Sequence, residues 1–329
     1  VTALMFEQFR NTFGASFNAL PSTVKALLVN TAMDQIGTST FNDPDCGCTF
    51  EYETGPDWTT GYGLVDAQAA VAAIRSKSFI EDQVSPGNTQ DNFTIDVTAG
   101  MPELRFTLAW DDEPGDIATA ETAAKLVNNL NLVLIAPDNT QHFPWVLDAL
   151  PMTATAGDGA PDPIDQADIN DNPARRDVNN RDNVEQVVVN NPMVGTWTIR
   201  VTAATLPNGN TQPYSLAGDF RTLNIVNPQT GDVAEAGDPN NPNVVLVTVE
   251  AVQPYATDTS SSLVDAAVSD FDVEIEGTPA SIISGLPVGD QFWLNVLPAS
   301  GVYSAGSKYD LTVRWDGHGQ DTETNAILF

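Results

Sequence analysis

The chain of 329 residues is poor in basic side chains: 13 Lys and Arg stand against 44 Asp and Glu, which gives a formal net charge of −31. Nucleic acid and anionic membrane surfaces repel so acidic a protein, so neither is expected as a partner. The charge favours cations instead, above all Ca²⁺. Only four of the basic residues are Lys, a composition typical of proteins in saline surroundings.

Long apolar runs, cysteines and histidines are scarce as well. No apolar run approaches the roughly 18 residues that a membrane span needs, so none is expected. Cys46 and Cys48 are too few for a metal site and read as a local pair or two free thiols in a surface loop. His142 and His318 stand alone in expected turns, without a nearby serine and carboxylate, so we expect surface or packing roles for both.

Enough hydrophobic residues are present for packed cores. They make up 42% of the chain, which excludes wholesale disorder, and the length fits two or three domains. The hydrophobic pattern divides the chain into three regions, 1–76, 79–221 and 222–329, of which the first has helical spacing and the other two alternate with a period of two.

Residues 1–76 predict three helices, which start near Val1, Pro21 and Asp66. Proline suits the first turn of a helix, and Asp66 is a typical N-cap. A polar loop is expected over 37–60. The first helix starts without a cap. The helices bury little by themselves, and this chain is expected to supply no sheet or further helices nearby to cover them, so the pattern indicates a covering partner and a longer chain upstream of Val1.

Residues 79–221 predict strands without intervening helices, the pattern of a β-sandwich or jelly roll. The expected strands are 93–97, 104–110, 130–135, 187–189 and 197–201, and the stretch 152–183 is expected to be a long exposed loop. Residues 222–329 predict a second, smaller, immunoglobulin-like sandwich with strands at 244–249, 271–275, 292–296 and 309–315.

Most of the six Trp residues fall in these strand patterns and are expected in the cores rather than on a carbohydrate platform. An exposed Trp145 would reopen the second possibility. A role of the last module as a carbohydrate or surface binder therefore stays open as a weaker reading.

One triplet imitates a catalytic motif. Gly37-Thr38-Ser39 matches the residues around the nucleophile of subtilisin-like proteases, but there the serine opens a buried helix and Ala-x-Pro follows. Here Ser39 lies in the expected loop, and no histidine lies in the same region, although a serine nucleophile needs a histidine base within reach. We therefore expect Ser39 to be non-catalytic.

The rest of region 1–76 nevertheless resembles the subtilase family. The run 21–32 (PSTVKALLVNTA) is similar to its penultimate helix, and 60–71 (TGYGLVDAQAAV) is similar to its closing Gly-x-Gly turn and last helix. Val1-Thr2-Ala3-Leu4 resembles the helix just after the catalytic serine segment. The resemblance implies that the Asp, His, oxyanion-hole Asn and nucleophilic Ser all precede this chain. No catalytic residue is then expected within it.

Region 79–221 resembles the jelly-roll module that follows the catalytic domain in some secreted alkaline subtilases and is similar to the P-domain of proprotein convertases. The runs 108–112 (LAWDD), 126–132 (LVNNLNL) and 181–187 (RDNVEQV) carry this resemblance. In the family the middle run is usually Val-Asn-Asp-Leu-Asp-Leu and helps to hold Ca²⁺. Asn129 and Asn131 replace the two acids, which should weaken the site.

Ca²⁺ takes six to eight oxygens from carboxylates, amides and backbone carbonyls. The candidate ligands are Asp111, Asp112, Asn129, Asn131, Asp182 and Glu185. They converge only if the ends of their strands meet. The alternative is that these residues simply serve turns and strand edges, as Asp and Asn often do.

Together these features predict a mixed fold, with the helical C-terminal end of an α/β subtilase domain followed by two all-β modules, jelly-roll-like and then immunoglobulin-like. The resemblance implies part of a secreted serine endopeptidase that reaches protein or peptide substrates through an upstream catalytic half, with calcium as a structural ion. The alternative is a non-catalytic, calcium-dependent binding or adhesion protein.

Overall fold

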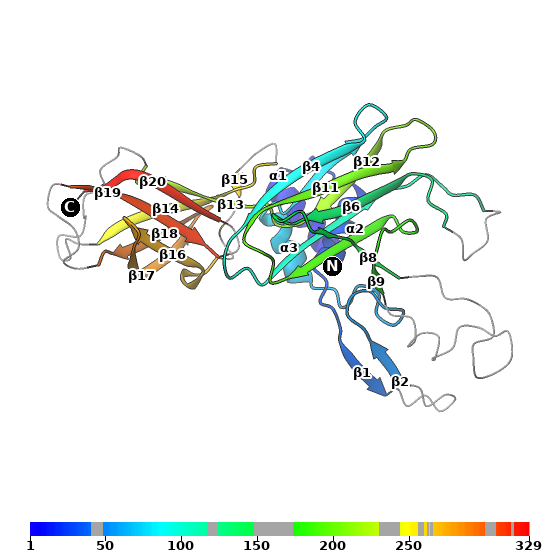
Figure 1. The fold of residues 1–329 in the computed structure, drawn as a ribbon, viewed down its shortest axis with the longest axis horizontal. Helices are drawn as coiled ribbons and strands as arrows, with labels where there is room; N and C mark the ends of the chain where they lie inside the picture. Colours follow the sequence, from blue (N-terminus) through cyan, green and yellow to red (C-terminus); the bar gives the residue numbers. More distant parts are fainter. Residues whose placement is uncertain are drawn as a thin grey trace.

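The computed structural model describes residues 1–40, 49–117, 124–147, 174–229, 244–255, 260–261, 263, 266–299, 307–316 and 319–328. In these ranges the protein is mostly β-structure, with helices gathered near the N-terminal end (Figure 1). None of the described helices is long and apolar enough to cross a membrane. Cys46, Cys48 and His318 lie outside the described residues.

The three predicted helices are confirmed as α1 (Thr2–Phe13), α2 (Pro21–Asn30) and α3 (Ala67–Arg75). Pro21 occupies the first turn of α2. The Asp66 side chain accepts the N–H of Ala69 and caps α3, as its sequence position indicates. Met5 and Phe9 of α1 share a buried cluster with Ile74 of α3.

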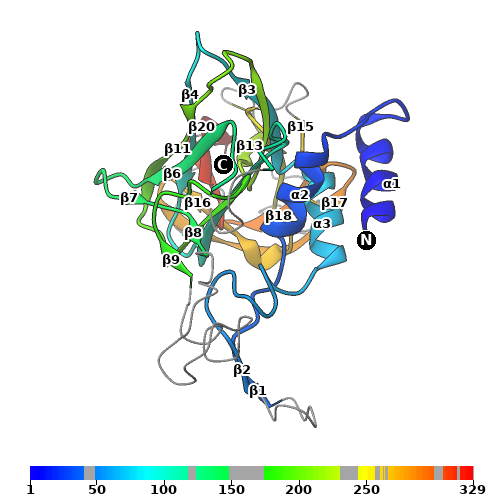
Figure 2. The same cartoon turned by 90° about the vertical axis from the view of Figure 1, so that its right-hand side faces the viewer.

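The expected polar loop over 37–60 is only partly a loop. It contains two antiparallel strands, β1 (Gly37–Thr40) and β2 (Thr49–Tyr52), which form an arm that projects from the rest of the protein (Figures 1 and 2). β-Branched threonines in both segments and the aromatic residues of β2 favour this extended conformation.

The second region is a sandwich of two antiparallel sheets, as predicted. One sheet has the order β10-β5-β12-β3 and the other β4-β11-β6-β7. Their strands are β3 (Phe79–Val84), β4 (Gln90–Val97), β5 (Glu103–Trp110), β6 (Asn129–Ile135), β7 (Gln141–His142), β10 (Val184–Asn190), β11 (Gly195–Thr205) and β12 (Gln212–Ala217). Trp110, Trp197 and Tyr214 fill the space between the sheets. A short pair, β8 (Trp145–Val146) and β9 (Arg175–Arg176), lies beside β10.

The helices find their covering sheet within this chain. Leu27 of α2 and Ile74 of α3 belong to one buried cluster with Ala109, Val184 and Ala217, which lie on the outer face of the β10-β5-β12-β3 sheet. The expectation that the chain supplies no sheet nearby for the helices is therefore wrong for α2. The contact joins residues about 80 to 190 positions apart, which periodicity along the chain cannot reveal.

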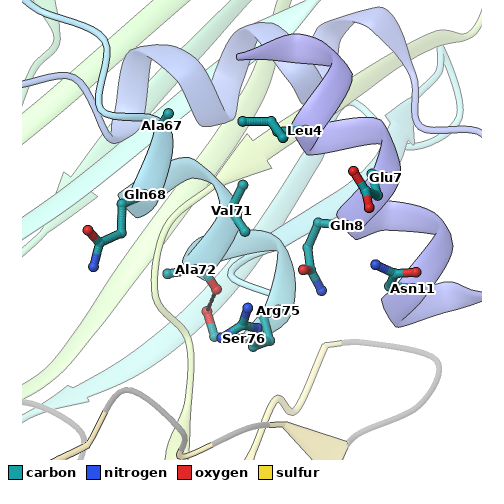
Figure 3. A pocket seen from close by; sticks show the side chains of 10 residues that line it. All are labelled: Leu4, Glu7, Gln8, Asn11, Ala67, Gln68, Val71, Ala72, Arg75 and Ser76. Atoms are coloured by element: carbon teal, nitrogen blue, oxygen red, sulfur yellow. Dashed lines mark hydrogen bonds between the residues drawn. The ribbon is translucent and has the colours of Figure 1, made fainter.

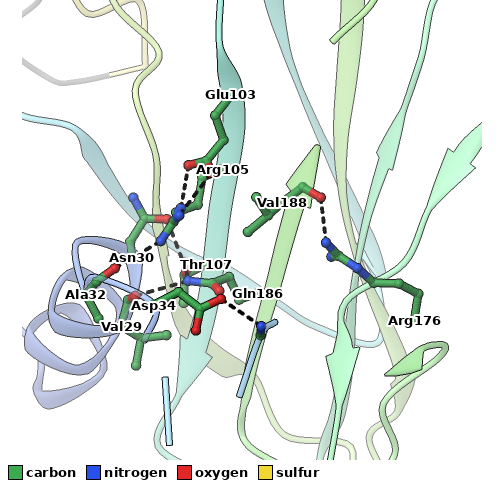
Figure 4. A network of polar contacts seen from close by, with 11 residues as sticks. Val29, Asn30, Ala32, Asp34, Glu103, Arg105, Thr107, Arg176, Gln186 and Val188 are labelled. Atoms are coloured by element: carbon green, nitrogen blue, oxygen red, sulfur yellow. Dashed lines mark hydrogen bonds and ion pairs between the residues drawn. The ribbon is translucent and has the colours of Figure 1, made fainter. Parts of the chain in front are cut away.

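Side chains of the same sheet also satisfy the C-terminal end of α2 (Figure 4). Gln186 Nε2 donates to the carbonyl of Val29 at 3.0 Å, and Arg105 Nη1 donates to the carbonyl of Ala32 at 3.1 Å. The last carbonyls of a helix have no partner within it, so such donors stabilise its end. The sheet therefore fixes α2 by both packing and hydrogen bonds.

The last module is a single curved sheet of order β13-β14-β18-β17-β16-β19-β20, with β15 (Ser260–Ser261) beside β14. Its strands are β13 (Thr222–Asn227), β14 (Val245–Val252), β16 (Phe271–Ile275), β17 (Thr278–Val288), β18 (Gln291–Leu297), β19 (Lys308–Trp315) and β20 (Gly319–Leu328), with a 3₁₀ turn, η1 (Val268–Asp270), before β16. The Asp321 carboxylate of β20 accepts the N–H of Ile225 at 2.8 Å, which brings the outermost strands together. The module is thus a nearly closed barrel around one core, a correction to the expected two-sheet sandwich.

The barrel is anchored to the sandwich just after β14. The Tyr255 hydroxyl accepts the N–H of Thr94 at 2.7 Å and donates to its carbonyl at 3.0 Å. Its ring centroid lies 5.2 Å from that of Phe93 and 5.5 Å from that of Phe220. Gln253, which is fully buried, donates to the carbonyl of Lys77 at 3.0 Å. Hydrogen bonds and aromatic packing therefore both join the two modules.

Candidate calcium site

Glu185 is the most unusual side chain of the sandwich. It is 0% exposed, its Oε2 accepts the N–H of Leu132 at 2.6 Å, and its Oε1 is buried without a hydrogen-bond partner. Burial raises the pKa of this carboxyl well above its usual value, the Leu132 N–H opposes that rise, and the charge of Asp182 adds to it. An acid in this position is costly unless something pairs with it.

Two amide oxygens next to this carboxylate are in the same condition. The alternation of β6 buries Leu130 and Leu132 in the core and places Asn129 and Asn131 on the other face. The Oδ1 atoms of Asn129 and Asn131 are both buried without a hydrogen-bond partner. Glu185 is bonded to Leu132, which follows Asn131 directly, so its carboxylate lies against the strand that carries both amides.

With Glu185 ionised, all three atoms are acceptors only, so no proton of their own can satisfy a neighbour. An unpartnered buried acceptor costs about 1–3 kcal/mol, which makes three in one place expensive unless a ligand is bound there. One carboxylate and two amide oxygens are hard ligands of the kind that Ca²⁺ takes. The donor set therefore fits a calcium ion, with further oxygens needed to reach six.

Two more of the expected ligands lie beside these atoms. The Asp112 carboxylate accepts the N–H groups of Val127 and Asn128, each at 2.8 Å, and so fixes the chain just before Asn129. Asp182 Oδ2 accepts from Asn179 Nδ2 at 3.0 Å, three positions before Glu185. Both carboxylates have lone pairs left for an ion.

Asp111 contacts the start of α2. The alternation of β5 buries Trp110 between the sheets and turns Asp111 toward the helices, where its Oδ2 accepts the N–H of Ser22 at 3.3 Å. A carboxylate at the first turn of a helix satisfies a free N–H and interacts well with the helix dipole. Its position indicates a cap on α2 rather than an ion ligand.

Sequence reasoning passed over Asn179 and Asn180. Asn179 is fully buried, and its Oδ1 accepts the N–H groups of Arg181 at 2.9 Å and Asp182 at 3.2 Å. Asn180 Oδ1 accepts from Asn129 Nδ2 at 2.7 Å. The sequence signal that could have identified them is the run Asn-Asn-Arg-Asp-Asn over 179–183, in which turn-forming amides precede the expected ligand Asp182.

Acidic and histidine side chains alone do not make a metal site in the described part of the chain, where no group of three or more His, Cys, Asp or Glu could hold an ion. The candidate site therefore depends on the amide oxygens of Asn129 and Asn131.

The other residues considered for chemistry are placed as follows. Ser39 pairs with Phe50 in the β1–β2 arm. The ring of His142 lies 5.3 Å from that of Trp197. Burial lowers the pKa of His142, and the positive charge of Arg176 lowers it further against the opposing effect of Asp138. These contacts are those of a packing histidine.

No protein-family model and no curated protein matches this chain. Weak similarities to solved structures include a DUF4785 family protein from Legionella pneumophila (12% identity, 75% of this chain, 58% of that chain, TM-score 0.23). A second is the lipase BlEst2 of Bacillus licheniformis in propeptide form (12% identity, 75% of this chain, 40% of that chain, TM-score 0.22). A third is the adhesin domain of Epf from Streptococcus pyogenes (7% identity, 76% of this chain, 77% of that chain, TM-score 0.25). The chain spans less than two thirds of the length of the first two.

Proposed function

We propose that this chain is the C-terminal part of a secreted subtilisin-like serine endopeptidase whose Ser–His–Asp triad lies upstream of Val1. The observation that carries the proposal is that the two stretches resembling the end of that family's catalytic domain lie side by side. Met33, just after α2, donates its N–H to Leu64 at 2.9 Å and accepts the Leu64 N–H at 2.8 Å. The run 21–32 and the run 60–71 therefore form one unit.

The Gly-x-Gly turn within that unit has a physical reason. Gly61 and Gly63 have φ values of 61° and 105°, which favour glycine. A Cβ on Gly63 would lie 2.2 Å from the carbonyl oxygen of Met33. Only glycine lets the two stretches approach so closely, which supports reading the motif as functional packing rather than as a chance match.

The outer side of the helices supports a further domain. Leu4, Leu64 and Val65 are all exposed large apolar residues. A groove of about 540 Å³ runs between α1 and α3, with Leu4 and Val71 among its lining residues (Figure 3). Exposed apolar surfaces of this kind mark interaction sites. We propose that the upstream catalytic domain packs here.

In the proposed enzyme the triad would perform acyl transfer on peptide bonds, with the serine as nucleophile, the histidine as base and the aspartate as orienting group. The residues of this chain would touch no reacting atom. Their role would be to complete the packing of the catalytic domain and to attach it to the sandwich through α2. Calcium at Glu185, Asn129 and Asn131 would rigidify the sandwich.

The gene upstream of the Val1 codon tests this proposal directly. We expect it to encode Gly-Thr-Ser-x-Ala-x-Pro immediately before Val1, with histidine and aspartate motifs farther upstream. A start codon and signal peptide close to Val1 would leave no room for a triad and would contradict the proposal.

Activity of the 1–329 chain gives an independent check. We expect it neither to hydrolyse casein nor to react with a fluorophosphonate probe for activated serines. Hydrolysis that Ser39→Ala abolishes would place the nucleophile inside this chain and contradict the assignment.

The alternative proposal is a calcium-dependent binding or adhesion protein without catalysis. It is favoured by the three unpartnered oxygens, because a calcium site in the sandwich does not require a protease. A start codon close to Val1, together with calcium binding, would support it over the endopeptidase.

A further inference from the structure

The barrel exposes a large apolar residue where the sequence predicts core. Trp110, Trp197 and Trp315 are buried, as expected, but Trp293 is 38% exposed. It lies in the middle of β18, where buried and outward-facing residues alternate. Its neighbours Phe292 and Leu294 point into the barrel, so Trp293 faces outward.

The pairing of three adjacent strands places eight other side chains around Trp293. Leu286 of β17 and Thr248 of β14 lie directly opposite it on either side. We define the Trp293 face as the outward positions of these strands: Leu246, Thr248 and Glu250 of β14, Gln291, Trp293 and Asn295 of β18, and Ser284, Leu286 and Val288 of β17. The described pairs across it are in unbroken register, so the three strands lie side by side.

Several large apolar side chains of this face are exposed. Leu246 and Leu286 are 41% and 51% exposed, and Ile283 at the edge of the face is also exposed. Single exposed apolar residues are normal, but a contiguous group around a tryptophan marks a surface that binds something.

The polar part of the face carries a single ionisable side chain, although the chain has a net charge of −31. Asn295 donates to the Ser284 hydroxyl at 2.9 Å, and Gln291 adds a neutral donor and acceptor, whereas Thr248 is buried. The single ionisable member is Glu250, whose Oε1 accepts from Asn224 Nδ2 at 2.8 Å. A ligand complementary to this face is therefore neutral, partly apolar and rich in hydrogen-bonding groups.

We propose that the Trp293 face binds a neutral polysaccharide in an extended chain. A sugar ring presents an apolar C–H face that packs on an aromatic ring, while its hydroxyls bond to amides and hydroxyls such as those of Asn295 and Gln291. The net charge of −31 repels anionic polysaccharides and a second copy of this chain. This inference is independent of the protease proposal.

Co-sedimentation of the 1–329 chain with insoluble cellulose and chitin tests the inference. We expect binding to at least one of them that persists in 1 M NaCl, because the ligand is uncharged. Trp293→Ala should weaken it at least tenfold. Trp58→Ala is the matched control, since Trp58 is 41% exposed but belongs to the N-terminal region, and it should bind like the native chain.

Leu286→Ser provides a second variant that leaves the tryptophan in place, should Trp293→Ala fail to fold. It should also reduce binding at an unchanged melting temperature. Four outcomes would overturn the inference: no binding to either polymer, equal loss in Trp58→Ala, equal binding to anionic alginate, or a concentration-dependent dimer that Trp293→Ala dissociates. The last outcome would instead identify a second copy as the partner.

Discussion

At the scale of single residues, the partner of Glu185 decides whether the sandwich holds calcium. If Ca²⁺ binds its Oε1 with the Asn129 and Asn131 oxygens, binding stabilises the folded state by mass action, by about 2.7 kcal/mol at a hundredfold excess over Kd. We expect calcium to raise the melting temperature of the native chain over that in chelator, and Glu185→Gln to abolish the rise. Differential scanning calorimetry at matched ionic strength measures both.

Asp111→Asn is the contrasting variant, because Asp111 caps the start of α2. It should lower the melting temperature equally with and without calcium and leave the rise intact. Two results would contradict the calcium site. One is a calcium-induced rise in melting temperature that survives in Glu185→Gln. The other is an unchanged melting temperature when calcium is added to native chain that metal analysis has shown to be free of calcium.

Asp34 allows a prediction about pH. Its Oδ2 accepts the N–H of Gly55 at 2.8 Å and its Oδ1 is buried without a partner. Burial raises the pKa of this carboxyl despite that hydrogen bond. The folded state therefore holds the Asp34 proton more tightly than the unfolded state, in which the pKa is about 3.9. The free energy of unfolding should then fall as the pH rises from about 3.9 through the raised pKa of the folded state.

Asp34→Asn removes this loss, so its stability relative to the native chain should grow as pH rises through that window. Asp138 provides the opposite case, because the N–H of Thr140 lowers the pKa of its carboxyl. Asp138→Asn should lose stability relative to the native chain as the pH rises toward the pKa of this carboxyl in the unfolded state. Urea denaturation from pH 3 to 7 compares them, and slopes of the same sign would contradict the assignment.

At the scale of elements, the Gly-x-Gly turn tests how tightly the two helical stretches pack. Gly61 has φ 61° with open space around it, whereas a Cβ on Gly63 would meet the Met33 backbone at 2.2 Å. Gly61→Ala should cost about 1 kcal/mol of unfolding free energy from backbone strain alone. Gly63→Ala should cost on the order of 3 kcal/mol, because backbone must also move. Equal costs by urea denaturation would mean that the contact is not tight.

Elements with strong local patterns could be predicted from the sequence. The caps and spacing of α2 and α3 suffice to place those helices, and the strands of alternating Leu and Val agree closely with β5, β6 and β18. The missed strands lack such a pattern. β20 (GQDTETNAIL) is largely polar, and β17 (TPASIISGLPV) contains two prolines and a glycine, so only pairing with neighbours makes them strands.

Within the candidate site, the resemblance of the runs 108–112, 126–132 and 181–187 selected Glu185, Asn129 and Asn131 but could not separate Asp111 from Asp112. Adjacent residues of a strand face opposite sides of the sheet. Which of the two turns toward the ion therefore depends on the register of β5, and the burial of Trp110 fixes that register.

At the scale of the whole molecule, Tyr255 couples the barrel to the sandwich. Its hydroxyl bonds both backbone groups of Thr94, and its ring packs on Phe93 and Phe220. Tyr255→Ala removes both contributions and should separate thermal unfolding into two transitions. Tyr255→Phe keeps the ring and should cost about 0.5–1.5 kcal/mol while preserving a single transition. Calorimetry distinguishes these cases, and a single transition in Tyr255→Ala would show that other contacts couple the modules.

The way the modules meet could not be predicted from the sequence. Neither the docking of α2 on the β10-β5-β12-β3 sheet nor the closing of the barrel by β13 and β20 leaves a periodic trace, because both join segments far apart in the chain. Local patterns predict elements, whereas their arrangement depends on which buried faces fit together.

The core shared by the helices and the sandwich limits which gene segments can be exchanged between proteins. Val184, Ala109 and Ala217 pack against α2 and α3 rather than into the sandwich interior. A gene segment for 79–221 transplanted alone into another protein would carry a naked apolar sheet face and would tend to aggregate. The sandwich should therefore travel between genomes together with the helices that cover it.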